Sequence, residues 1–428
     1  MIAGLGAVLV SCATPSLIEN GALRQDSQEQ IVARVERALG TSLRAPLDAQ
    51  VIGRDDVPGL LRRVVDRAQP PAVRASYQDG LTAVGLWPEG VDVLEALGRV
   101  TREEVAGLYV PSERRLYVVR DVAFPFRLTA ASWLVQRDLG SEIALTHEVV
   151  HALQHEMHPE LFGHDRFAVG QDDVEAGLEA AREGHATWYG LAAIEGIGDP
   201  PAPERFAEMI RNDVASRREG AFAEAPALLR MTMFVPYAEG YRLAAGERGA
   251  VLDAPPVSSE QVLHPERRRE AFEAIDLAAV RAELPARCRV VQENSAGELG
   301  IATLLQDLAL SGQQAPSSAS EGWDGDRYLA ARCDDRREFV WLTVWDSDAD
   351  ARDFESAYRV IAEAVRVRAG LVGNPVVRRA GREVHISSPA LAQPADALLG
   401  RARRARVATL DEVFAFFAEP RIAEATPP

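Results

Sequence analysis

Ser141-Glu-Ile-Ala-Leu-Thr-His147-Glu148-Val-Val-His151-Ala-Leu-Gln-His-Glu156 is the stretch around which this chain is organised. It has no Gly or Pro after Gly140, and its pattern predicts one helix. Histidines four residues apart share a helical face, so His147 and His151 can bind one divalent cation from one side. Glu148 lies about 100° further round the helix and can reach a water molecule on that cation. This arrangement is typical of metal-assisted hydrolysis with the glutamate as general base.

The other positions of this helix predict which of its sides is buried. A helical wheel gives one apolar stripe, which we expect to face the core: Ile143, Thr146, Val150, Leu153 and Met157. His147, His151, His155 and Glu148 lie to one side of that stripe, where a cleft can open. The alternative is a buried helix whose histidines are satisfied by hydrogen bonds.

A second predicted helix, residues 172–190, contains the candidates for a third ligand, which a catalytic zinc site requires. Glu183 is the preferred candidate because it lies in mid-helix among small residues. His185 is its main rival, and Glu179 is a further candidate that could instead hydrogen-bond a ligand histidine. His155 is excluded because it lies roughly 12 Å along the helix axis from His147.

The distribution of histidines also favours a metal site. Six of the eight histidines of the chain fall between His147 and His185. Two of them, His158 and His164, lie near a helix end and in a loop, where a ligand is poorly fixed.

Two motifs together resemble a known family. Residues 183–186, Glu-Gly-His-Ala, match the Glu-Gly-x-Ala pattern that provides the third ligand in many glutamate-zincin metallopeptidases, and residues 147–154 resemble the HExxHALQ helix of a group of bacterial lipoproteins assigned as zinc metallopeptidases. Further similar segments are residues 107–110, 236–240, 255–266, 297–300, 322–328 and 345–347. Two positions depart from the pattern, because His155 and His185 stand where acidic residues are usual. The resemblance implies zinc (Zn²⁺), ligands His147, His151 and Glu183, and a peptide or protein substrate.

The resemblance also implies a donor to the oxyanion of the transition state. Zincins commonly have a downstream Tyr or His in that role, and Tyr237 and His264 are the candidates, with Tyr241 also considered. The alternative is that the tyrosines belong to the core with satisfied hydroxyl groups and that His264 caps a local turn.

The N-terminus and the cysteines predict an exported protein. Residues 9–12, Leu-Val-Ser-Cys, resemble a bacterial lipobox, although no charged segment precedes them. We therefore expect residues 1–27 to be a lipoprotein signal and tether, with a lipid anchor on Cys12 that places the chain in the cell envelope; a frayed apolar N-terminus is the alternative. In an oxidising compartment Cys288 and Cys333 are expected to form a disulfide rather than remain as buried thiols.

The chain of 428 residues has a net charge of −17 and no lysine, which argues against nucleic acid as a partner. Its composition is that of a globular protein, and we expect an α+β fold. Residues 28–285 are predicted to form a mainly helical, zincin-like metallopeptidase domain, and residues 286–428 a smaller α+β C-terminal module. A break is expected near residues 235–236 of an otherwise helical stretch.

Several hairpins are predicted. Residues 105–110 and 115–119 form one, whose edge could bind an extended peptide by strand addition. The C-terminal module is expected to contain hairpins of residues 328–332 with 338–345 and 376–379 with 383–386, followed by a helix at residues 410–418.

The function predicted from these features is zinc-dependent hydrolysis of peptide bonds. An alternative is a metal-binding envelope lipoprotein that acts as a scaffold or binding protein without catalysis. A third possibility is a metal-dependent hydrolase of another amide, such as cell-wall peptide.

Overall fold

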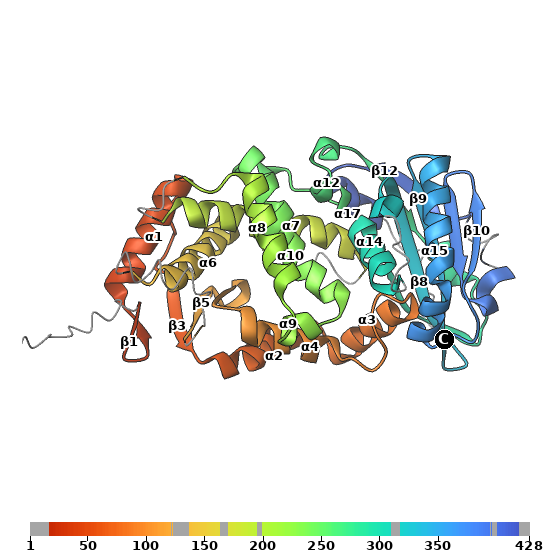
Figure 1. Cartoon of the computed structure of the whole chain (residues 1–428), viewed down its shortest axis with the longest axis horizontal. Helices are drawn as coiled ribbons and strands as arrows, with labels where there is room; N and C mark the ends of the chain where they lie inside the picture. The colour runs from red at the N-terminus through yellow and green to blue at the C-terminus, as the bar shows by residue number, and fades with distance from the viewer. Residues whose placement is uncertain are drawn as a thin grey trace, which may run out of the picture. The chain divides into compact units, whose positions relative to one another are not determined.

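The computed structural model describes residues 17–120, 122, 137–162, 170–194, 199–309, 317–393, 395 and 400–418. These residues form a mixed α+β fold with four small sheets (Figure 1). The chain divides into two compact units, the first of residues 1–56, 105–156 and 189–200, and the second of residues 57–104, 157–188 and 201–428. The predicted lipobox with Cys12 lies outside the described residues, and no helix within them is long and apolar enough to cross a membrane.

The first unit contains the predicted hairpin. Strands β4 (Gly107–Val110) and β5 (Arg115–Val119) pair antiparallel on either side of η2 (Pro111–Glu113), as predicted. A strand that was not predicted, β3 (Asp48–Ile52), pairs parallel with β5, so that β4 lies at an edge of the sheet. The described part of the stretch expected to be a tether contains β1 (Ile18–Glu19), β2 (Ala22–Leu23) and the start of α1 (Gln25–Leu39). The short helix η1 (Arg54–Asp56) also belongs to this unit.

Helix α6 (Leu139–Met157) confirms the helix predicted around His147. Thr146, Val150 and Leu153 are buried as expected, whereas the prediction for Met157 is wrong. Met157 is the last residue of the helix, and its side chain is 37% exposed because the chain turns away at His158-Pro159. The neighbouring positions Leu145, Val149 and Ala152 are buried too, so α6 is enclosed on more than the one predicted side.

The second unit begins with helices and includes the longer part of the predicted third-ligand helix. Helix α7 spans Asp172–Ala192, and its last four residues belong to the first unit. The other helical elements up to residue 267 are α2 (Val57–Ala68), α3 (Pro71–Ala83), α4 (Val93–Glu104), η3 (Pro159–Phe162), α8 (Pro203–Ser216), α9 (Ala221–Glu224), α10 (Ala227–Glu247), α11 (Ala250–Asp253), α12 (Glu260–Leu263) and η4 (Pro265–Arg267).

Helices α7 and α10 cross in very close contact. A Cβ atom on Gly184 would lie 2.0 Å from the carbonyl oxygen of Gly240, and one on Gly240 would lie 2.2 Å from that of Ala180. The break expected near residues 235–236 is wrong, because α10 continues through Pro236. Burial of Pro236 and its neighbours on this helix offsets the loss of one backbone hydrogen bond.

A five-stranded antiparallel sheet forms the centre of the C-terminal part of the second unit. Its order is β10 (Val376–Ala380), β11 (Glu383–Ser387), β9 (Arg336–Trp345), β8 (Trp323–Cys333) and β7 (Cys288–Asn294). The two predicted hairpins are β8–β9 and β10–β11, and both are confirmed. Cys288 and Cys333 face each other in β7 and β8 and form the predicted disulfide.

Helices and a separate strand pair complete this part of the chain. Helix α15 (Asp348–Ala369) packs along the sheet (Figure 1). Strand β6 (Phe272–Asp276) pairs antiparallel with β12 (Arg403–Val407). The other helical elements are α13 (Ala278–Ala282), α14 (Gly297–Leu308), η5 (Ser317–Ser320), η6 (Pro389–Leu391) and α17 (Leu410–Ala418), the last of which has the predicted bounds.

Candidate metal centre

The two histidines of α6 direct their ring nitrogens toward each other. The Nε2 atoms of His147 and His151 are 3.0 Å apart, and the two rings are nearly perpendicular, at 84°. Nδ1 of His151 lies 2.8 Å from the side-chain oxygen of Gln154, which is fully buried. Because an amide oxygen only accepts, this bond requires the proton on Nδ1 and leaves the Nε2 lone pair of His151 as a possible ligand.

Glu148 lies beside this pair and is held by the edge strand of the first unit. Its Oε2 accepts a hydrogen bond of 2.7 Å from the backbone N–H of Tyr109 in β4. The side chain is only 8% exposed, and a Cβ on Gly107 would lie 2.8 Å from its Cγ. The carboxylate therefore has a fixed place next to the two histidines rather than a freely rotating one.

Helix α7 provides the third group. Near its end, Gly190 lies so close to α6 that a Cβ there would be 3.3 Å from both N and Cα of His147. Glu183 precedes Gly190 by seven residues, or two turns, and therefore lies on the same face of α7. Within the described part of the chain, His147, His151 and Glu183 are the group that could hold a metal, with one donor atom of each within 4.8 Å of the others.

The rival ligands have other surroundings. Glu179 forms an ion pair with Arg182, and burial raises the pKa of its carboxyl group. The side chain of His185 is 1% exposed, in the packed interior. Nδ1 of His155 lies 2.9 Å from the Tyr109 hydroxyl oxygen. His164 lies outside the described residues.

The two predicted oxyanion donors both lie in the second unit. Tyr237 is on α10, 37% exposed and three residues before Gly240, so it lies one turn from the point where α10 crosses α7 at Gly184. Tyr241 is buried, and its hydroxyl donates to the carbonyl of Pro201.

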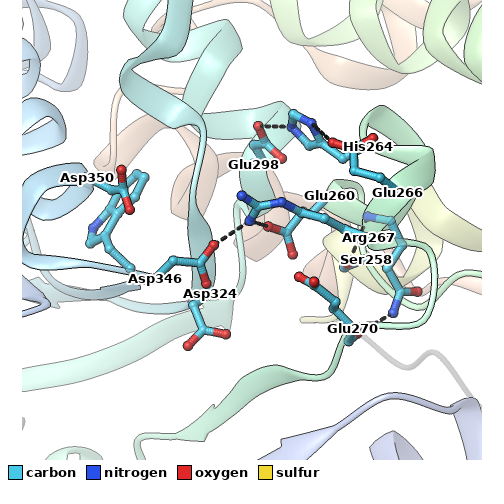
Figure 2. Close-up of polar contacts among 12 residues, drawn as sticks. Ser258, Glu260, His264, Glu266, Arg267, Glu270, Glu298, Asp324, Asp346 and Asp350 are labelled. Carbon is cyan, nitrogen blue, oxygen red and sulfur yellow. Dashed lines mark hydrogen bonds and ion pairs between the residues drawn. The ribbon is translucent and has the colours of Figure 1, made fainter.

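His264 belongs to a polar cluster in which Figure 2 shows it between two carboxylates. Its Nε2 lies 2.8 Å from Oε1 of the buried Glu298 and its Nδ1 lies 3.5 Å from Glu266. The hydrogen bond with Glu298 raises the pKa of His264. Its expected part in catalysis, like that of Tyr237, stays a prediction.

The donor set fits a catalytic zinc ion. Two imidazoles and one carboxylate are a common ligand set of catalytic zinc, which keeps a fourth position for water or substrate.

Two contacts of the site, those made by Gln154 and by the Tyr109 N–H, were not predicted from the sequence. Gln154 carried a signal, since it follows His151 by three residues on the same face. The Tyr109 N–H carried none, because a backbone group leaves no trace in a side-chain motif.

Comparison with known proteins gives one partial match. Residues 286–398 match a domain of unknown function, DUF8575. This segment contains none of His147, Glu148, His151 and Glu183. No curated protein and no solved structure matches the chain, so no function can be transferred to the candidate site from a relative.

Proposed function

We propose that this chain hydrolyses peptide bonds with the help of a zinc ion held by His147, His151 and Glu183. The observation that carries the proposal is the convergence of these three donors beside Glu148. A purely structural zinc site would fill its fourth position with protein and would have no use for a neighbouring carboxylate. Zinc, when bound, would polarise the scissile carbonyl and lower the pKa of water.

The protein's own part in this reaction falls mainly to Glu148. It takes a proton from the attacking water and later gives it to the nitrogen of the leaving amine, so the carboxylate is regenerated in each cycle. The hydrogen bond from the Tyr109 N–H to its Oε2 supports this role, because it fixes the position of the carboxylate beside the two histidines.

The position of β4 supports a peptide as substrate. This strand is at the edge of its sheet and directly contacts Glu148. An extended peptide that paired with this edge would lie close to the proposed base. The Glu148 carboxylate already uses the N–H of Tyr109, so such pairing would have to use the other outward-facing groups of the strand.

The proposal is tested by metal analysis and by digestion of a broad peptide library read by mass spectrometry. We expect about one zinc per chain, its loss in Glu183→Ala, and a rate lower by roughly 10²–10⁴-fold in Glu148→Gln with zinc and fold retained. Full zinc with no cleavage by the wild type would favour the scaffold function, and unchanged cleavage in Glu148→Gln would exclude Glu148 as the base.

We further propose that the chain is anchored in the cell envelope by lipid on Cys12. The support for this is the Leu-Val-Ser-Cys sequence of residues 9–12. Because one acyl chain binds a membrane weakly, stable anchoring requires more than one. Cys12→Ser should leave the membrane fraction, and quantitative membrane retention of that variant would exclude the anchor.

A further inference from the structure

Strand β4 has a peptide N–H that its own sheet does not use. The backbone N–H of Val119 donates to the carbonyl of Ala106 over 3.0 Å, which sets the alternation of the β4–β5 ladder. In an antiparallel pair, the backbone N–H and C=O groups of only every second residue point toward the partner strand. Leu108 therefore hydrogen-bonds to Tyr117, and the N–H of Tyr109 points away from β5. That outward N–H donates to Oε2 of Glu148 over 2.7 Å.

Gly107 lets the strand approach this close. A Cβ atom at this position would lie 2.8 Å from Cγ of Glu148 and 3.5 Å from its Cδ and Oε1. Any side chain at residue 107 would therefore have to displace the Glu148 side chain, so glycine is required by the neighbour and not by the backbone conformation.

A second contact fixes the same strand on α6. The Tyr109 hydroxyl lies 2.9 Å from Nδ1 of His155, and the two ring centroids are 5.8 Å apart. His155 follows Glu148 by seven residues, so both lie on one face of α6, two turns apart. Tyr109 therefore contacts this face at two points, by its backbone N–H and by its hydroxyl group. The residue is buried, with 6% of its surface exposed.

We infer that β4 positions the proposed general base: Tyr109 and Gly107 hold Glu148 by Oε2, the His155–Tyr109 pair fixes the strand, and Oε1 is left to take the proton. Tyr109, Gly107 and His155 are thus positioning residues. The inference rests on the proposed function for its catalytic meaning. The contacts between β4 and Glu148 involve only residues of this chain and are expected in metal-free protein as well.

The first experiment tests the hydrogen bond between the Tyr109 N–H and Glu148 independently of catalysis. Selective ¹⁵N labelling of the eight tyrosines gives a signal for the Tyr109 N–H in metal-free protein, and its hydrogen exchange is followed. We expect exchange about tenfold or more faster in Glu148→Ala, and slow exchange again in Glu148→Gln, whose amide oxygen can still accept. The N–H of Tyr117, within the β4–β5 ladder, is the internal control. Equal exchange at Tyr109 in wild type and Glu148→Ala, with Tyr117 unchanged, would overturn the inference.

The second experiment measures the consequence. Gly107→Ala should lower kcat by roughly 10²-fold with zinc retained, because a displacement of about 1 Å misplaces the base. Gly59→Ala, where an added Cβ meets nothing within 4 Å, is the matched control. No hydrolysis by the wild type would overturn the proposed function, whereas wild-type hydrolysis that is unchanged in Gly107→Ala would overturn this inference alone.

Discussion

Gln154 lies outside the proposed ligand set, but it contacts one of the proposed ligands, His151. Its side-chain oxygen fixes Nδ1 of His151, and it has no exposed surface. A partner of this kind orients a ligand imidazole and selects its tautomer, and its loss typically lowers metal affinity 10–100-fold. At this scale the sequence predicted His147, Glu148, His151 and Glu183 by spacing and motif, because each of them carries its own chemistry.

Substitution of Gln154 tests whether its side chain orients His151 for metal binding. We expect Gln154→Leu to weaken zinc binding about 10–100-fold, measured by competition with a chromophoric chelator. Gln154→Glu keeps an acceptor at the same place and should retain most of the affinity. Equal affinities in all three proteins would show that the hydrogen bond does not orient His151.

Asp173, at the start of α7, is a buried carboxyl group with an unusual titration. It is 3% exposed, and its Oδ1 accepts hydrogen bonds from N and Oγ of Ser259. Its Oδ2 is buried and has no hydrogen-bond partner in the described part of the chain. Burial, together with the nearby charges of Asp326 and Glu298, raises the pKa of Asp173 to about 7.

This raised pKa makes a prediction about stability and pH. The folded protein binds the Asp173 proton more tightly than the unfolded chain, whose carboxyl has a pKa of 3.8. The stabilising contribution is therefore complete below that value and is lost as the pH rises through about 7. Between pH 5 and 8 the wild type should lose on the order of 2 kcal/mol more of its free energy of unfolding than Asp173→Asn does, measured by urea denaturation. Parallel pH profiles of the two proteins would contradict this.

The elements that the sequence predicted are those whose pattern is local. The β8–β9 and β10–β11 hairpins and the helices α6, α7 and α17 each follow from alternation or helical periodicity within one stretch of sequence. Besides the short pair β1–β2, four strands were not predicted, namely β3, β6, β7 and β12. Each pairs with a segment distant in sequence; β6, for example, pairs with β12 more than a hundred residues later. A short strand of this kind is stabilised by its partner and not by its own composition.

The crossing of α7 and α10 could not be predicted from the sequence, although the helix at residues 172–190 was. The sequence shows small residues on α7 around Glu183, but it does not show which helix packs against them. Gly184 lies against the carbonyl of Gly240, and this crossing determines where α7 presents Glu183.

Substitutions of two glycines separate this contact from helix propensity. Gly184→Ala places a Cβ 2.0 Å from a backbone oxygen that cannot rotate away, so we expect a loss of about 1–3 kcal/mol in the free energy of unfolding. Gly246→Ala, near the exposed end of α10, meets nothing within 4 Å and should raise it by up to about 1 kcal/mol. The two variants are compared by denaturant titration. A neutral or stabilising Gly184→Ala would mean that the helices can separate without cost.

At the scale of the molecule, distant segments that first served only to mark a resemblance meet in one network of the second unit. Ser259 binds Asp173 and the N–H of Leu299, and Asp326 accepts from the N–H groups of Ala296 and Gly297. Figure 2 shows the adjoining cluster, in which Arg267 pairs with both Glu260 and Asp346. These contacts give the segments around residues 258–267, 297–300, 322–328 and 345–347 a structural role. Sequence could not show it, because the partners lie tens of residues apart.

The same network bears on the predicted boundary at residue 285. Within the second unit several contacts join residues on either side of it. Arg332 forms two hydrogen bonds with Asp79, of 2.6 and 2.7 Å, and the side-chain oxygen of Asn294 accepts from the N–H of Asp172. Leu81 and Trp87 share a buried core with Trp341.

A fragment of residues 28–285 is therefore expected to be unstable alone. It would leave Asp79 without its two arginine partners, Arg332 and Arg337, and would expose apolar side chains that are buried against β9. It should therefore lack a cooperative thermal transition and be cut rapidly by protease within residues 57–104 and 201–285. Addition of a separate fragment of residues 286–428 is the matched control, because it restores the same contacts without restoring the peptide bond, and it should recover both protease resistance and the transition. If residues 28–285 alone melted cooperatively at the midpoint of the full chain, they would form an independent domain and the contacts across residue 285 would contribute little to its stability.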